Sequence, residues 1–301
     1  MSGLLPPSFK GRGAGGDRSA NPPAARGSIT SPPLLLSASP YKLLLVVFIC
    51  ALTAACASPT LAPRPTPALV RVAVTDLTQP LLLDLAAAYA AVNPDVVFAP
   101  SLAPPNDLGT MLASGQADLD LTTAPDPRLF ATPIGYVPFT VVVHPGNPLA
   151  QLSLAQAQGL LSGRLNDWGQ VGGPAGAVQV VTRGAGTSAD RALAATAMGP
   201  ITPTASARSS MGWVVAPTWA AMRQLVGQNP SAIGYLIGPE MDGTVKALPL
   251  VDANGAPVPL RLLVVAQAAT DPTGPARDFL AWAQSPAGQA AVAPRNGALQ
   301  P

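Results

Sequence analysis

Segments typical of strands alternate with segments typical of helices in the first half of the folded part of this chain. This alternation constrains the fold most strongly. Residues 69–75, 95–99 and 117–123 are short apolar or alternating runs, typical of strands that are buried on one or both faces. Between the first two, residues 78–92 predict an alanine-rich helix with Thr78 as its N-cap and a proline in its first turn. The pattern predicts an α/β fold with largely parallel sheets flanked by helices.

The later elements continue this pattern without an internal repeat of fixed length. Asn106 and Asp107 can cap a short helix, and Ser153 with Gln156 forms a capping box for another. In α/β sheets, ligands collect at the carboxyl ends of the strands, where the following helices begin. The further predicted strands cover residues 136–144, 231–236 and 260–266, and the further helices cover residues 153–162, 216–228 and 275–292, with a break near Pro286.

The clearest candidate binding element is a glycine turn between a strand and a helix. The β-branched residues 178–182 precede Arg183-Gly184-Ala185-Gly186-Thr187-Ser188, and an alanine-rich run follows. Glycines let the backbone approach a ligand closely, and the first N–H groups of a helix are free to bind an anion. The turn therefore predicts an anion site. Many glycine turns capped by Ser or Thr open a helix that binds no ligand, so this simpler interpretation stays open.

The charge distribution disfavours nucleic acid as a partner. The net charge is +2, but the first 56 residues hold five of the 17 basic groups and only one of the 15 acidic groups. The remainder is slightly acidic and has Lys246 as its single lysine. Because proteins that bind nucleic acids depend on clustered cations, we expect no nucleic-acid partner.

The scarcity of cysteine and histidine disfavours the common classes of enzyme. Cys50 and Cys56 both lie in the first 56 residues, so the remainder can form no internal disulfide and no thiolate metal site. His144 is the single histidine, which excludes a multi-histidine metal centre. Asp118 and Asp120 lie on a predicted strand without an evident partner base. We therefore expect no enzymatic activity, no metal and no cofactor.

The N-terminal region is predicted to be a leader rather than part of the fold. Residues 1–41 are rich in Pro, Gly and Ser and have no hydrophobic period, which indicates disorder. Lys42 and the apolar run after it lead to Ala54-Ala55-Cys56, which resembles a bacterial lipoprotein signal with a lipidated cysteine. Leader and signal thus cover residues 1–56, and residues 57–68 form a proline-rich tether. An ordinary signal and an uncleaved anchor are the alternatives.

Several further motifs follow one another in a specific order. They are Val141-Val142-Val143-His144-Pro145-Gly146-Asn147-Pro148, residues 152–163 with Asn166-Asp167-Trp168 and Val171-Gly172-Gly173, the turn Gly184-Ala185-Gly186-Thr187, and Asn229-Pro230-Ser231-Ala232-Ile233-Gly234-Tyr235-Leu236. This order resembles the phosphate-binding proteins of bacterial ABC-type phosphate uptake systems. The resemblance covers about half of the folded part and is looser over residues 69–123.

The resemblance implies a type II periplasmic-binding-protein-like fold, in which two α/β lobes close on an anion in the cleft between them. Residues 69–138 and 236–301 would build one lobe, and residues 139–235 the other. It also implies a monomer outside the cytoplasm, anchored to the membrane by a lipidated Cys56, that delivers its anion to an ABC-type permease.

The resemblance also implies a set of site residues, with departures from the family pattern. Thr123 stands where the family has an aspartate that accepts the proton of phosphate, and Ala185 replaces a serine. Arg183 lies closer to the turn than the family's arginine, which leaves Arg191 as an alternative. Asp76 would oppose an anion if it pointed inward. The matching positions are Thr78, Gln79, Asn106, Thr123, Arg183, Ala185, Gly186 and Thr187.

The sequence therefore predicts a lipid-anchored solute-binding protein that captures phosphate or a related small oxyanion. Molybdate, tungstate and sulfate are alternative ligands, because Thr123 lacks the negative charge that rejects an unprotonated anion. Since the site departs from the family pattern, a surface scaffold or sensor partner without a ligand is a further hypothesis.

Overall fold

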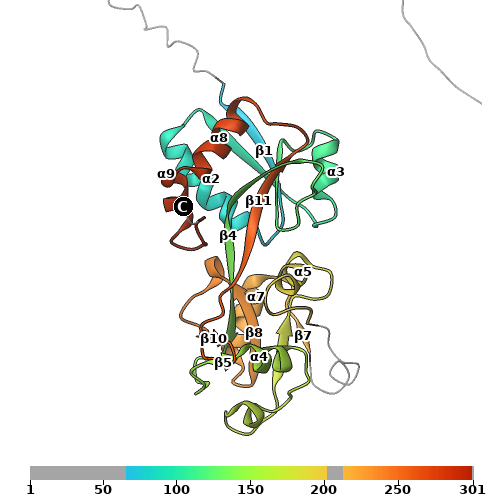
Figure 1. Ribbon diagram of the computed structural model, residues 1–301, viewed down its shortest axis with the longest axis vertical. Helices are drawn as coiled ribbons and strands as arrows, with labels where there is room; N and C mark the ends of the chain where they lie inside the picture. Colours follow the sequence, from blue (N-terminus) through green and yellow to red (C-terminus); the bar gives the residue numbers. More distant parts are fainter. Residues whose placement is uncertain (1–65, 202–212, 300–301) are drawn as a thin grey trace, which may run out of the picture. The chain divides into compact units, whose positions relative to one another are not determined.

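The computed structural model describes residues 66–201 and 213–299 of the chain. The predicted leader, the predicted lipidation residue Cys56 and most of the predicted tether lie outside these residues. The residues from Arg64 onward belong to one structural unit. In this unit two lobes are joined by the long strand β4, with lobe 1 at the top of Figure 1 and lobe 2 below it.

Lobe 1 is built on parallel strands that antiparallel strands extend. β1 (Ala68–Val74) lies between β2 (Val96–Leu102) and β3 (Leu119–Thr122) and is parallel to both. β11 (Leu260–Ala268) lies between β3 and β4 (Phe130–Val143) and is antiparallel to both. The parallel strands are the ones that the alternation of strands and helices in the sequence predicted.

The strand β4 belongs to both lobes. Its first part, from Phe130 to Phe139, pairs with β11, and its last part, from Phe139 to Val143, pairs with β8 (Ala232–Ile237). A strand of 14 residues spans about 45 Å, which is enough to cross from one lobe into the other. Main-chain hydrogen bonds along this strand therefore unite the lobes in one nine-stranded sheet.

Lobe 2 continues the sheet with parallel strands on one side of β8. β6 is parallel to β8 and to β7, whereas β9 is antiparallel to the last part of β4. A separate small sheet pairs β10 with β5. The bounds of these strands are β5 (Leu152–Ser153), β6 (Gln179–Thr182), β7 (Val214–Val215), β9 (Lys246–Leu248) and β10 (Leu250–Val251).

The pairing of β9 and β10 differs from the lobe boundaries expected from the sequence. Residues 236–301 were all expected in the first lobe, but residues 246–251 pair with strands of lobe 2. The chain rejoins lobe 1 with β11. Strands of two or three residues have no hydrophobic period, so sequence patterns do not reveal where they pair.

The predicted helix signals are only partly confirmed. Thr78 and Asp107 stand at the N-cap positions of the first two helices, but neither side chain forms the capping hydrogen bond. The capping box of α4 (Leu154–Leu161) is confirmed, because the Ser153 hydroxyl accepts from the Gln156 N–H and the Gln156 side chain accepts from the Ser153 N–H. The break predicted near Pro286 separates α8 from α9. Further helices are α2 (Gln79–Val92), α3 (Leu108–Ala113), α8 (Gly274–Gln284) and α9 (Pro286–Val292) in lobe 1, α5 (Ser188–Ala194) and α7 (Trp219–Gln228) in lobe 2, and the 3-10 turns η1 (Trp168–Val171) and η2 (Gly238–Glu240).

Aromatic side chains join the two ends of the folded chain in the core of lobe 1. The centre of the Tyr89 ring in α2 lies 5.4 Å from the centre of the Phe279 ring and 5.1 Å from that of the Trp282 ring. Phe279 and Trp282 both belong to α8. Phe98 of β2 contacts Tyr89 and Phe279 in the same edge-to-face geometry. Such pairs contribute about 0.5–1.5 kcal/mol each beyond their buried area, so they hold α8 against the first half of the lobe.

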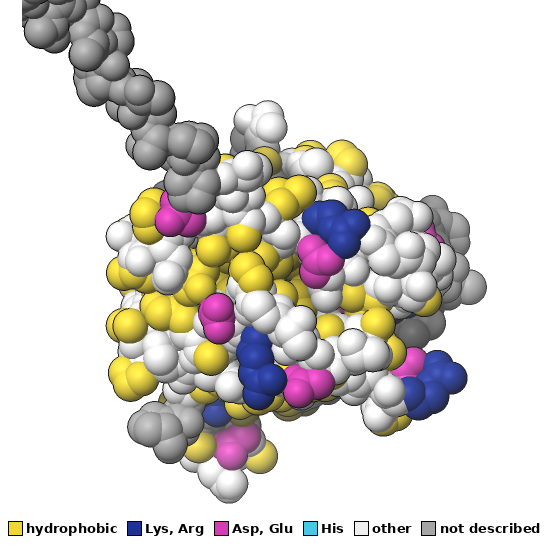
Figure 2. Space-filling view, turned by 90° about the horizontal axis from the view of Figure 1, so that it is seen from above, with side chains coloured by type: hydrophobic (Ala, Val, Ile, Leu, Met, Phe, Trp, Pro, Cys, Tyr) yellow, Lys and Arg dark blue, Asp and Glu magenta, His cyan; other side chains and the backbone are white. Residues whose placement is uncertain are grey.

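Within residues 66–201 and 213–299, none of the helices has the length and apolar character needed to cross a membrane. Figure 2 views the molecule from the lobe 1 end, where hydrophobic side chains gather in one area and basic side chains lie near acidic ones. An ion pair of this kind in lobe 1 joins Arg71 and Asp118 at 2.5 Å.

Asp120 is a buried acidic residue in β3. It lies opposite Ala73 of β1, which packs against Leu108 and Leu112 of α3. The residue is 1% exposed, and its Oδ1 atom has no hydrogen-bond partner among the described residues. Because burial disfavours the ionised form, the pKa of Asp120 is raised to about 7.

We predict that Asp120 makes the stability of the protein depend on pH. The pKa of an exposed aspartate is 3.8, so the fold binds this proton more tightly than the unfolded chain does. The resulting stabilisation is complete below about pH 4 and is lost as the pH rises to about 7, by about 1.4 kcal/mol per pKa unit. In urea unfolding, Asp120→Asn should therefore gain stability relative to the wild type between about pH 5 and about pH 8.

Asp126 provides the control for this experiment, because hydrogen bonds from Arg128 lower its pKa to about 2. It stays ionised over the same range, so the stability difference between Asp126→Asn and the wild type should not change with pH. A constant difference for Asp120→Asn as well would contradict the prediction.

Candidate functional site

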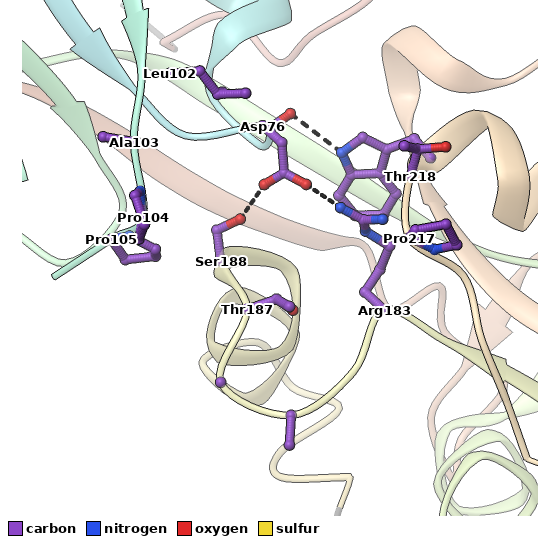
Figure 3. Close-up of a pocket in the computed structure, with 13 residues that line it drawn as sticks. Asp76, Leu102, Ala103, Pro104, Pro105, Arg183, Thr187, Ser188, Pro217 and Thr218 are labelled. Carbon is purple, nitrogen blue, oxygen red and sulfur yellow. Dashed lines mark hydrogen bonds and ion pairs between the residues drawn. The ribbon is translucent and has the colours of Figure 1, made fainter. Parts of the chain in front are cut away.

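A pocket of about 590 Å³ lies between the two lobes. It is lined by the loops after β1 and β2 in lobe 1 and by the segments after β6 and β7 in lobe 2 (Figure 3). All these segments follow the carboxyl ends of parallel strands, where ligands of α/β proteins collect. The lining residues are Asp76, Leu102, Ala103, Pro104, Pro105, Arg183, Ala185, Gly186, Thr187, Ser188, Pro217, Thr218 and Trp219.

The loop after β1 is held so that Asp76 lines the pocket. The Thr78 hydroxyl donates to the Leu121 carbonyl at 3.0 Å and accepts from the Thr75 N–H at 3.1 Å. Leu77 is buried in the hydrophobic core. Since Thr75, Leu77 and Thr78 are all turned into lobe 1, Asp76 is the residue of this loop that reaches the pocket.

The turn after β6 has the predicted glycine geometry, but several of its donors are used within the turn. Gly184 and Gly186 have φ angles of 92° and 77°, a region that favours glycine. The Thr187 hydroxyl accepts from the Asp190 N–H at 3.2 Å, as N-cap of α5, and donates to the Gly184 carbonyl at 3.0 Å. The Gly186 N–H donates to the Asp190 carboxylate at 2.9 Å. A solute that uses the Gly186 N–H or the Thr187 hydroxyl must therefore compete with these bonds.

Arg183 is the buried cation of the pocket, with a side chain that is 6% exposed. Its Nη1 atom donates to the Ala216 carbonyl at 2.9 Å, and its guanidinium carbon lies 4.9 Å from the centre of the Trp219 ring. Its main-chain N–H donates to the Tyr235 hydroxyl at 3.2 Å. Burial raises the pKa of Tyr235, so this hydroxyl stays neutral. The contacts with Ala216 and Trp219 hold the guanidinium group at the pocket.

Asp76 forms an ion pair with Arg183 across the lobes. The Asp76 carboxylate accepts hydrogen bonds from Arg183 Nη2 and from the Ser188 hydroxyl (Figure 3). In addition, the Trp219 indole N–H donates to the main-chain carbonyl of Asp76 at 3.2 Å. Asp76 belongs to lobe 1 and these partners belong to lobe 2. The protein itself therefore bridges the pocket and neutralises its arginine.

The structure divides the predicted site residues into two groups. The pocket does not include Thr78, because its hydroxyl is used inside lobe 1, or Gln79, whose N–H donates to the Thr75 carbonyl at 2.9 Å. Thr123, expected at the place of a proton acceptor, is not a lining residue either. The predicted residues that do line the pocket are Arg183, Ala185, Gly186 and Thr187.

Asn106 and Arg191 form a second contact between the lobes. Arg191 Nη1 donates to Asn106 Oδ1 at 2.8 Å, and both residues are exposed. Neither residue lines the pocket. Arg183, and not its alternative Arg191, is therefore the arginine of the pocket.

Sequence reasoning did not assign Asp76, Trp219 or Thr218 to the site. Asp76 was expected to oppose an anion if it pointed inward, and it does line the pocket. Trp219 packs in the core, and its indole N–H reaches the loop of Asp76. The signal that could have found these residues is their place directly after a strand or at a helix start.

Among the described residues, no group of three or more His, Cys, Asp or Glu side chains is placed to bind a metal ion. The pocket instead presents a guanidinium group, a carboxylate and several hydroxyl groups between apolar walls. Such a set can bind a small charged solute by hydrogen bonds and charge.

Two α/β lobes that share one strand and enclose a pocket define a two-lobed binding fold of the type II class. The chain belongs to the PBP superfamily, because the family model of the PBP superfamily domain matches residues 61–257. A comparison with curated proteins gives no match.

Solved structures share this fold at low sequence identity. A protein described as a phosphate ABC transporter substrate-binding protein from Clostridium perfringens, with bound phosphate, is 18% identical with a TM-score of 0.65, over 77% of this chain and 100% of that one. An ABC-type phosphate transport receptor from Vibrio cholerae is 19% identical with a TM-score of 0.58, over the same shares. The reduced OxyR regulatory domain from Pseudomonas aeruginosa is 19% identical with a TM-score of 0.52, over 72% and 95%. At these identities the likeness shows the fold alone.

We predict that the Thr187 hydroxyl stabilises α5 even without a solute. Thr187→Val keeps the branched shape but removes the N-cap acceptor, and the loss of such a cap costs about 1 kcal/mol. Thr187→Ser retains the hydroxyl and should cost much less. Urea unfolding of both variants without added solute measures the difference, and equal stabilities of the two variants would show that the cap contributes nothing.

Proposed function

We propose that this protein captures a small oxyanion, with phosphate as the first candidate, and delivers it to an ABC-type permease. The observation that carries the proposal is Arg183, a buried and fixed arginine in a pocket between two lobes. A guanidinium group stays charged and presents paired N–H donors that match the oxygens of an oxyanion. The N-terminus of α5 lies beside this arginine, and its helix dipole contributes about 0.3–1 kcal/mol to the free energy of binding an anion.

The names of the structural relatives support phosphate. The Clostridium perfringens protein is described with bound phosphate, and the Vibrio cholerae protein is described as a phosphate transport receptor. Closure of two lobes around a solute requires no chemical step, so the proposed role is transport rather than catalysis.

Sulfate, molybdate and tungstate are the alternative solutes. Ala185 lines the pocket with a methyl group, where a serine would supply a hydroxyl donor. A hydrogen bond to a charged group is worth about 1.5–3 kcal/mol, so the lack of this donor weakens the binding of any oxyanion. Thr123 does not line the pocket and supplies no acceptor for the proton of phosphate. These features relax the preference for phosphate over unprotonated oxyanions.

We also propose where the protein acts. Lipidation of Cys56 would anchor it to the membrane on the extracytoplasmic side, and residues 57–68 would serve as an extended spacer. In this arrangement a single copy of the protein can close on a solute and present it to the permease.

A scaffold or sensor partner without a solute is the second candidate function. The observation that favours it is the ion pair of Asp76 and Arg183, because Asp76 already engages the arginine of the pocket. An arginine that is already neutralised binds a further anion less strongly.

Thermal unfolding of the full-length chain with a panel of solutes separates the two functions. The panel contains phosphate, sulfate, molybdate, tungstate and small carboxylates. A solute at about a hundredfold its dissociation constant stabilises the native state by about 2.7 kcal/mol, so a bound oxyanion should raise the Tm clearly, and calorimetry should give its affinity.

Arginine variants test where the oxyanion binds. Arg183→Met should abolish the shift in Tm, because it removes the cation of the pocket. Arg261→Met is the matched control, since Arg261 also stacks on an aromatic ring, that of Tyr136, but does not line the pocket. No response of the wild type to any oxyanion would rule out the transport function and leave the scaffold.

A further inference from the structure

We propose that Asp76 is an internal anion that occupies the site of the solute, so that an oxyanion binds by displacing the Asp76 carboxylate from Arg183. This inference rests on the proposed function and adds to it how the site is held before binding and which solutes can enter. The observation behind it is that the charged donors of the pocket are already engaged by a carboxylate from the opposite lobe.

The contacts of Asp76 are those that an oxyanion would make. One carboxylate oxygen accepts from Arg183 Nη2, and the other accepts from the Ser188 hydroxyl at the first position of α5 (Figure 3). An oxyanion beside Arg183 would need the same two donors. Because Asp76 already uses both donors, the carboxylate and the solute compete for them.

Asp76 does not engage every hydrogen-bond donor on this edge of the guanidinium group. Nε and Nη2 of an arginine point to the same side and form a fork for two oxygens, but Asp76 uses only Nη2. Nε of Arg183 is buried and has no hydrogen-bond partner among the described residues. Asp76 has no third oxygen with which to fill it, because its other oxygen is bound to Ser188.

A tetrahedral oxyanion can satisfy all three donors at once. Two of its oxygens can accept from Nε and Nη2 of Arg183, and a third can accept from the Ser188 hydroxyl. A monocarboxylate has two oxygens, like Asp76, and gains no additional bond when it replaces that side chain. It must also compete with a tethered group, whose effective concentration is on the order of millimolar or higher. The site should therefore select phosphate-like oxyanions over small monocarboxylates.

Asp76 also holds the lobes together before the solute arrives. The ion pair spans 107 positions of the sequence and joins the loop after β1 to the end of β6. Release of Asp76 removes this contact, and the incoming oxyanion replaces it with contacts of its own. The cost of breaking the ion pair lowers the affinity for the solute.

Calorimetric titration of the full-length chain with inorganic phosphate, and separately with acetate, tests the proposal. Asp76→Asn keeps the shape of the side chain without its charge, and Asp76→Ser shortens it. Both variants should bind phosphate at least about tenfold more tightly than the wild type, while acetate should bind the wild type with no measurable affinity. Asp118→Asn is the matched control, because it breaks the ion pair with Arg71 inside lobe 1 and should leave phosphate affinity unchanged.

The outcomes distinguish this inference from the proposed function. If the wild type binds phosphate and both Asp76 variants bind it equally well or more weakly, the displacement of Asp76 is wrong, although the proposed function stands. If phosphate binds the variants but not the wild type, Asp76 blocks the site and does not yield to the solute, so the displacement and the transport of phosphate by the native chain are both wrong. If no form of the chain binds any oxyanion, both are wrong.

A measurement on the wild type keeps the test independent of variant stability. The Nε–H resonance of Arg183 in nitrogen-edited NMR reports whether this donor gains an acceptor. Addition of phosphate should move it downfield, because an oxygen then accepts from Nε. Binding of phosphate without a shift of this resonance would overturn the proposal.

Discussion

Main-chain hydrogen bonds along β4 hold the two lobes in register, and the position of the pocket depends on them. β4 pairs with β11 up to Phe139 and with β8 from Phe139 onward. The loops after the parallel strands of each lobe are thereby brought to face each other. A change in the distance between the lobes must therefore bend the sheet near Phe139, where the partner of β4 changes.

The electrostatics of the pocket follow from the burial of one charged group. Arg183 is taken out of water by Trp219 and the Ala216 carbonyl, and an arginine in such a place needs a negative partner. Asp76 provides it from the other lobe. The same interaction joins the two lobes at the pocket.

Local structure was the most predictable part of the fold. The capping box of Ser153 and Gln156 and the helix break at Pro286 depend on residues that are close in sequence, so their patterns were sufficient. The pairing of β9 and β10 with lobe 2 was not predictable, because strands this short are stabilised by their partners and not by their own composition.

The candidate site was predictable only where one local segment forms it. The glycine turn from Arg183 to Thr187 lines the pocket because its geometry is fixed by Gly184 and Gly186. Thr78 and Gln79, at the start of another helix, do not line it, since hydrogen bonds inside lobe 1 turn them away. A helix start is thus a candidate by its sequence, but its orientation is set by packing.

The sequence by itself determined the alternation of strands and helices, the glycine turn and the presence of an arginine beside it, because each depends on backbone preferences of adjacent residues. Only the tertiary structure decided that Asp76 meets Arg183. The two residues are 107 positions apart, and Asp76 reaches the pocket because its neighbours Leu77 and Thr78 are buried in lobe 1. Burial of these neighbours depends on the packing of the whole sheet, and a local sequence pattern does not predict that packing.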